Sequence, residues 1–242
     1  MAASTSGAGA TVRARPKSPA ARLSGPGVVV LMVVVGLVII YATDQIVPAT
    51  SERQAQLRVW LAARATGIAA YLLLTLQVTL GLVLSHPVNK STWKLSRTIF
   101  PWHDYLWVFI VTFVAVHAIS LALDPYAGVG FSGALVPGLS EYRSIPVALG
   151  TLALHAFVIT AVTARWTRLL PAGAWLVLHR LSIVVLGLAW VHGVLAGTDS
   201  SRLEPLYAGS GLVVLLAGAY RYWAVKRARP SFSTSLPEVS AR

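Results

Sequence analysis

The chain has 242 residues, of which 56% are hydrophobic and only 12% are charged, and its mean hydropathy is +0.69. A soluble domain carries about a quarter charged residues, so the composition excludes an ordinary water-soluble fold. The formal charge of +12 invites a nucleic-acid partner. However, the cations stand in short runs beside apolar segments, which is typical of membrane topology signals, and we expect no nucleic-acid binding.

Cysteine is absent from the chain. This excludes disulfides, iron–sulfur clusters, thiolate haem ligation and thiol redox catalysis. Any redox cofactor must therefore be held by nitrogen or oxygen ligands. Arginine outnumbers lysine sixteen to four, which, with abundant alanine, suggests a bacterial genome.

Two polar stretches enclose a long apolar region. Residues 1–25 are rich in Ala, Ser, Gly and Pro and carry four cations, so we predict a disordered basic tail, and we predict a second disordered tail over 229–242. The region 26–228 contains six apolar segments, at 27–47, 60–85, 103–123, 145–167, 174–196 and 205–226. Each is near the roughly 20 residues that span a bilayer. The sequence therefore predicts an all-α membrane bundle of six transmembrane helices.

The first segment also has features of a signal peptide, because basic residues precede an apolar run. The run from Gly27 to Ala42 is long for such a peptide, and no small-x-small cleavage site follows it closely. We predict that this helix is retained.

The distribution of charge predicts the orientation. With an inside N-terminus, thirteen cations lie in the inner segments and four lie in the outer loops, namely Arg53, Arg58, Arg143 and Arg202. Six acids fall outside: Asp44, Glu52, Asp124, Glu141, Asp199 and Glu204. The positive-inside rule therefore places both termini in the cytoplasm of a multi-pass plasma-membrane protein.

Four of the six histidines form two matched pairs. His103 and His117 lie fourteen residues apart on the third segment, and His179 and His192 lie thirteen apart on the fifth. These spacings correspond to roughly 21 and 20 Å of helix rise. Both segments run from inside to outside in the predicted orientation, so the histidines share two depths in the membrane.

Matched depths allow each pair to hold one haem iron from both sides, because imidazole is a suitable axial ligand. His103 and His179 form the inner pair, and His117 and His192 form the outer pair. The alternative for each ring is an interhelical hydrogen bond. For His155, in the middle of the fourth segment, we favour such a bond over a proton or quinone role, and we interpret His86 as interfacial.

One feature of the fifth segment conflicts with a regular helix. Thirteen residues turn about 1300°, so the two histidines lie roughly 140° apart around an ideal helix. Both cannot then face the third segment. We predict an irregular helix here, either through a kink or π-bulge accompanying Gly187 or through a loosened first turn at His179.

The stretches WHDYLWVFIVTFVAVH (102–117) and LHRLSIVVLGLAWVHG (178–193) resemble the paired-histidine helices of the ferric-reductase-like transmembrane superfamily. This superfamily includes metalloreductases, NADPH oxidases and the haem subunit of the bacterial methionine sulfoxide reductase system. The resemblance covers about 60–200 and implies two haem b groups, the inner one on His103 and His179 and the outer one on His117 and His192.

Cations and tryptophans near the two histidine depths are candidates for contacts with haem. Arg180 and Arg64, and with less support Arg97, could contact haem propionates. The alternative is that these arginines only flank the transmembrane helices and extend their charged ends toward water. Trp107 and Trp190 could pack on porphyrin, whereas Trp102 fits an interface belt better.

The resemblance implies transmembrane electron transfer by a component of an oxidoreductase. The sixteen residues after Lys226 are too few for a flavin and NAD(P)H domain. We therefore expect a separate donor, either a cytoplasmic flavoprotein, a flavin at the membrane face or a quinol. The acceptor lies outside and is ferric iron, oxygen or a partner oxidoreductase. The alternatives are a quinol-linked cytochrome b subunit of a respiratory complex and a non-enzymatic haem carrier or membrane subunit.

Overall fold

The computed structural model describes residues 25–46, 49–85, 89–171, 173–197 and 201–228. All regular secondary structure in these ranges is helical. The predicted tails, 1–25 and 229–242, lie outside the described residues except for Gly25, and so does His86.

The helices follow the six predicted segments and add two short elements. Their bounds are α1 Gly25–Ile46, α2 Glu52–Leu84, α3 Asn89–Leu123, α4 Gly130–Leu135, α5 Ser144–Arg165, the 3-10 turn η1 Thr167–Leu169, α6 Ala174–Arg180, α7 Ser182–Ala196 and α8 Glu204–Ala228. The sequence analysis missed α4 and η1, because each is shorter than the apolar periodicity that reveals a spanning helix.

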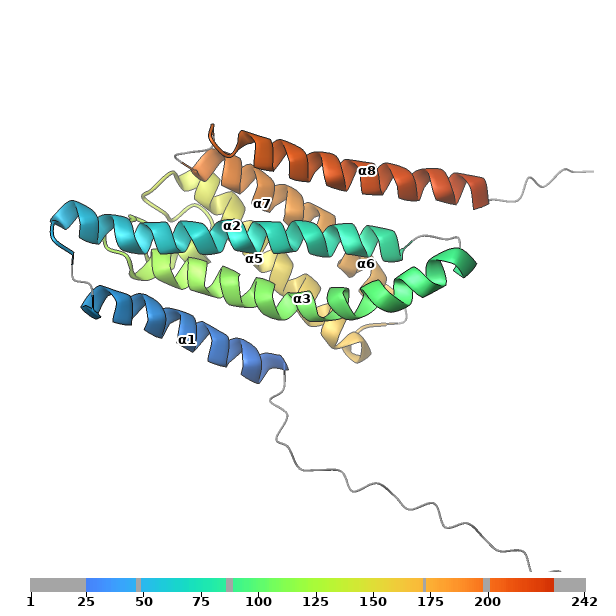
Figure 1. The fold of residues 1–242 in the computed structure, drawn as a ribbon, viewed down its shortest axis with the longest axis horizontal. Coiled ribbons are helices and arrows are strands. Elements are labelled where there is room, and N and C mark those ends of the chain that lie inside the picture. Colours follow the sequence, from blue (N-terminus) through green and yellow to red (C-terminus); the bar gives the residue numbers. More distant parts are fainter. Residues whose placement is uncertain (1–24, 47–48, 86–88, 172, 198–200, 229–242) are drawn as a thin grey trace, which may run out of the picture.

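Two predicted boundaries were wrong. Helix α2 begins eight residues before the predicted 60, because Ser51 caps it by accepting a hydrogen bond from the Gln54 amide at 3.2 Å. Helix α3 begins fourteen residues before the predicted 103 and continues through Pro101. Proline removes an amide donor from a helix and bends it, and Figure 1 shows a bend in the N-terminal part of α3.

In the part of the chain that the structure describes, five helical segments are long and apolar enough to cross a membrane: Gly25–Thr43, Glu52–Leu84, Lys94–Leu123, Ser144–Arg165 and Ala174–Ala196. The chain is therefore a multi-pass membrane protein. Helix α8, the predicted sixth span, is 25 residues long but is not among these five. Its sequence mixes Gly, Ser, Tyr and Arg221 with the apolar residues, which lowers its hydropathy.

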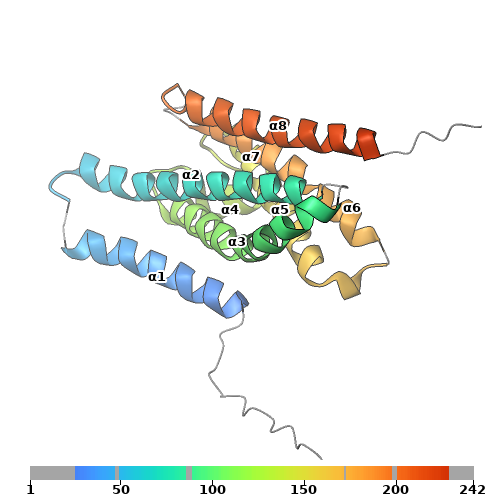
Figure 2. The same ribbon diagram turned by 45° about the vertical axis from the view of Figure 1, so that its right-hand side comes forward.

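The helices pack as two tight pairs with one helix on each outer side. Helix α2 packs along α3, and α5 packs along α6 and α7. Helix α1 contacts α3, whereas α8 contacts α2 on the opposite side of the bundle (Figures 1 and 2). Helix α7 therefore lies between α5 and α2, and α3 lies between α2 and α1.

The buried core lies at the middle of the bundle. The largest fully buried side chains are Ile110 of α3 and Val185 of α7. Along the chain, Ile110 lies midway between His103 and His117, and Val185 lies between His179 and His192. Along the chain, Ile110 and Val185 therefore separate the two histidine positions of their spans. Val185 belongs to an apolar cluster whose buried members are Tyr71, Leu74, Val78, Val185, Leu186 and Tyr207.

The predicted irregularity of the fifth span is confirmed. The α-helical pattern stops after Arg180 and resumes at Ser182, and the Leu181 amide donates to the Leu178 carbonyl at 3.0 Å, three residues back instead of four. Gly187 lies inside the continuous helix α7, and the interruption lies before this helix, at Leu181. The break lies two residues after His179, at the end of the first two turns of the span.

Candidate functional site

The structure brings the four histidines together in the two expected pairs. The ring centroids of His103 and His179 are 6.0 Å apart with the planes at 85°. Those of His117 and His192 are 6.4 Å apart at 78°. Helix α3 and the span formed by α6 and α7 therefore run in the same direction, and their rings meet at two levels.

The spacing within each pair is too long for a direct hydrogen bond. Two imidazoles joined nitrogen to nitrogen at about 2.9–3.0 Å would have centroids about 5.2 Å apart. Two imidazoles on opposite sides of one metal ion, with bonds of about 2.0–2.1 Å, would have centroids about 6.3 Å apart. The observed 6.0 and 6.4 Å are closer to the second distance than to the first.

Backbone carbonyls set the tautomer of three of the four rings. The Nδ1 atoms of His103, His117 and His192 lie 3.1, 2.7 and 2.8 Å from the carbonyl oxygens of Gln77, Ala63 and Pro146, respectively. A carbonyl only accepts, so each Nδ1 carries the hydrogen, and Nε2 of the neutral ring keeps its lone pair for a metal. A ligand histidine bonded in this way is oriented and made more basic.

The surroundings of the His103–His179 pair are less symmetrical. Gln77 is bonded twice to His103, because its Nε2 also donates to the His103 carbonyl at 2.9 Å. The Nδ1 atom of His179, in contrast, is buried without a hydrogen-bond partner among the described residues. The nearest aromatic contact of His179 besides His103 is Trp175, whose ring centroid is 5.9 Å away.

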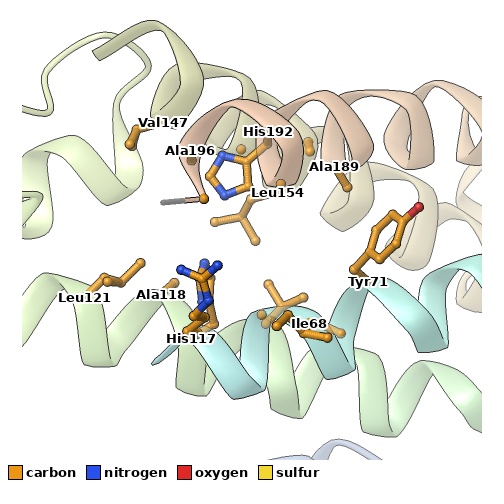
Figure 3. Close-up of a pocket in the computed structure, with 18 of the residues that line it drawn as sticks. Ile68, Tyr71, His117, Ala118, Leu121, Val147, Leu154, Ala189, His192 and Ala196 are labelled. Carbon is orange, nitrogen blue, oxygen red and sulfur yellow. The ribbon is translucent and has the colours of Figure 1, made fainter. Parts of the chain in front are cut away.

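A cavity of about 430 Å³ surrounds the His117–His192 pair. Figure 3 shows the two rings pointing toward each other across this space from α3 and α7. The wall is mainly apolar, and Arg64 is the only Arg, Lys, Asp or Glu among the described lining residues. The Arg64 guanidinium lies over the Trp60 ring, 4.9 Å from its centroid. Among its described lining residues, the cavity therefore combines two imidazole rings, a mainly apolar wall and one cation.

The other sequence candidates lie outside the two pairs. Arg180 and Arg97 are exposed near the His103–His179 level. The side chain of His155 is also exposed. Trp102 is 68% exposed, Trp107 contacts the Arg165 guanidinium, and Trp190 donates to the Tyr207 carbonyl of α8 at 3.1 Å.

Sequence reasoning missed the residues that support the rings. These are Gln77, the carbonyls of Ala63 and Pro146, and three glycines against which the rings pack: Gly67, Gly81 and Gly150. The sequence contained a signal for two of these glycines. Gly67 and Gly81 are fourteen residues apart, which is the spacing of His103 and His117, as expected for antiparallel helices in register.

Comparisons with known proteins agree with this geometry. No curated protein and no solved structure matches the chain. The family model for the ferric reductase like transmembrane component matches residues 66–190, just over half of the chain. This range contains His103, His117 and His179 and ends two residues before His192. The family carries electrons across membranes as a component of oxidoreductases. The chain therefore belongs to the ferric reductase like transmembrane component family.

Proposed function

We propose that the chain carries electrons across the membrane through two haem b groups, one held by His103 and His179 and the other by His117 and His192. The centroid spacing of 6.0 and 6.4 Å within the pairs is the observation that carries this proposal. When bound, the two irons would supply one-electron redox chemistry at two depths of the bilayer. The residues of this chain hold the irons, fix the ligand tautomers and exclude water between them.

The donor set fits haem better than other metal centres. Among the described residues, no three His, Cys, Asp or Glu side chains come together as a metal site, whereas structural zinc needs about four protein ligands. A metal held by two opposed imidazoles alone needs its remaining ligands from a macrocycle. The mainly apolar cavity of about 430 Å³ around His117 and His192 suits such a ring.

Cations near the two pairs fit the acidic groups of haem b. Arg64 lines the cavity of the His117–His192 pair, and Arg180 follows His179 directly at the end of α6. Propionates are anionic and bind guanidinium groups through charge-assisted hydrogen bonds. We therefore assign Arg64 to the propionates of the outer haem and Arg180 to those of the inner haem.

The proposed topology has six spans, with α8 as the sixth and both termini in the cytoplasm. Electrons enter the His103–His179 level from a cytoplasmic flavoprotein, a flavin or a membrane quinol. They pass the apolar layer of Ile110 and Val185 to the His117–His192 level. The acceptor on the outer side is ferric iron, oxygen or a partner oxidoreductase.

Absorption spectra of the purified chain test the proposed haem ligands. Oxidised and dithionite-reduced spectra should show low-spin b-type bands with two haems per chain. Replacing His117 or His179 with alanine should remove about one haem of the two, because a single imidazole holds iron much more weakly. His155→Ala is the matched control, because this exposed histidine belongs to neither pair, and it should keep both haems. Full haem content in His117→Ala or His179→Ala would contradict the assignment.

A further inference from the structure

The three anchored histidines share a feature on the helix that faces them. Each donates its Nδ1 hydrogen to a helix carbonyl, and in each case a glycine follows the acceptor by four residues. Gly67 follows Ala63, Gly81 follows Gln77 and Gly150 follows Pro146. The repetition in three places, on two different helices, points to a common physical requirement.

The glycines lie directly against the rings. A Cβ atom at Gly67 would be 2.8 Å from Nδ1 of His117, and one at Gly150 would be 2.6 Å from Nδ1 of His192. At Gly81 the nearest atom would be Cε1 of His103, at 3.2 Å. Contacts below 3.0 Å need something to shift, so any side chain at Gly67 or Gly150 would displace the ring.

Helix geometry explains why the glycine stands four residues after the acceptor. A helical Cβ points toward the N-terminus, and a side chain covers the turn that precedes its own Cα. The residue at position i therefore shields the carbonyl of residue i−4. That carbonyl already accepts from the amide of residue i, but its second lone pair remains available. Only glycine leaves room for an imidazole to reach it.

We propose that Gly67, Gly81 and Gly150 are positioning residues that expose one helix carbonyl each, so that His117, His103 and His192 are anchored through Nδ1 with Nε2 directed at the iron. This inference rests on the proposed haem ligation and names which residues tune it. Bonding through Nδ1 makes the ligand more basic, which stabilises ferric iron and lowers the reduction potential.

The test is redox titration of the purified full-length chain, followed by haem absorbance, for Gly67→Ala, Gly81→Ala and Gly150→Ala. Gly67→Ala and Gly150→Ala should raise the potential of the outer haem alone, although they lie on different helices. Gly81→Ala should raise that of the inner haem alone. We expect at least a tenfold change in the reduced-to-oxidised ratio at fixed potential, about 59 mV for a one-electron couple. Selective loss of the same single haem would also support the proposal.

Glycines without contacts provide matched controls. A Cβ at Gly187 of α7 or Gly211 of α8 would have nothing within 4 Å, so Gly187→Ala and Gly211→Ala should leave both potentials unchanged. Gly81→Ala is the mildest change and keeps the test informative if the other two variants fold poorly. Equal shifts of both haems, shifts as large in the controls, or unchanged potentials in all three variants would overturn the proposal. Absence of haem from the unmodified chain would instead overturn the proposed function.

Discussion

His179 is the one paired histidine whose ring has no carbonyl anchor among the described residues. The spacing of residues on the two facing spans offers a reason for this missing anchor. Thirteen residues separate His179 from His192, and thirteen separate Gly150 from Thr163. The register that sets Gly150 against His192 therefore assigns Thr163 to His179. The Thr163 hydroxyl donates to the carbonyl of Ile159, four residues earlier, at 2.7 Å, so this carbonyl is already in use.

An unanchored ligand is expected to exchange more readily than an anchored one. We predict that carbon monoxide converts one of the two haems in the dithionite-reduced protein, namely the haem of the His103–His179 pair, because His179 can leave the iron. His117→Ala, which keeps only this haem, should still bind the gas, whereas His103→Ala, which keeps only the outer haem, should not. The visible difference spectrum measures both. A spectrum that carbon monoxide leaves unchanged would show that His179 is held as firmly as the others.

At the residue scale, the sequence predicted which histidines lie together, but not the groups that support their rings. The pairing was predictable because four histidines at matched spacing are visible in a sequence. The acceptors Ala63, Gln77 and Pro146 contribute only backbone oxygen, which every residue possesses. Which carbonyl is used depends on the register between two helices, and that register appears only in the folded bundle.

At the level of elements, the loop before α5 completes the end of the helix that carries His192. Tyr142 donates its hydroxyl to the carbonyl of Ala196 at 3.2 Å, and Arg143 donates from Nη1 to that of Leu195 at 2.8 Å. The last carbonyls of a helix have no partner within the helix. These two side chains therefore fix the end of α7, close to His192.

Arg143 makes this contact from a left-handed backbone conformation, with φ at 39°. A side chain in that region costs about 1–2 kcal/mol relative to glycine. Arg143→Ala keeps this cost and loses the hydrogen bond, whereas Arg143→Gly loses both. We therefore predict that the alanine variant is less stable than the glycine variant by about 1 kcal/mol, measured by thermal melting in detergent followed by circular dichroism. Arg202→Ala, at another exposed loop arginine, is the control and should melt like the unmodified chain. An alanine variant as stable as the glycine variant would contradict the effect of the backbone conformation.

Prediction of the elements succeeded where composition decides and was less accurate where local contacts decide. The apolar runs predicted every long helix, because a bilayer selects length and hydropathy directly. The angular mismatch between His179 and His192 predicted an irregular span. The site of the break at Leu181, the cap at Ser51 and the short helix α4 depend on contacts among few residues, which no periodic pattern records.

At the scale of the whole molecule, the two histidine levels lie inside a shell with distinct tasks for its helices. Helices α3, α6 and α7 carry the four paired histidines, and α2 and α5 provide the carbonyls that orient three of them. Helix α8 is attached to this core by hydrogen bonds from α2 and α7, through Tyr71 with Ser210 and through Trp190 with the Tyr207 carbonyl. Such polar contacts between helices suit a spanning helix of low hydropathy, because a bilayer offers no competing partner.

The orientation of α8 decides whether the chain has six spans. Because the chain contains no cysteine, single cysteines can be labelled without background. Arg202→Cys precedes α8, and Lys226→Cys lies near its end. If α8 spans the membrane with its basic end in the cytoplasm, a membrane-impermeant maleimide will label Arg202→Cys in intact cells and Lys226→Cys only after permeabilisation. Ser51→Cys, between α1 and α2, should behave like Arg202→Cys, and Arg168→Cys, in η1, should behave like Lys226→Cys. Labelling of Arg202→Cys and Lys226→Cys from the outer side alike would place α8 along the membrane surface. The two termini would then lie on opposite sides of the membrane. That outcome would leave the histidine pairs unaffected, because the four histidines lie on α3, α6 and α7.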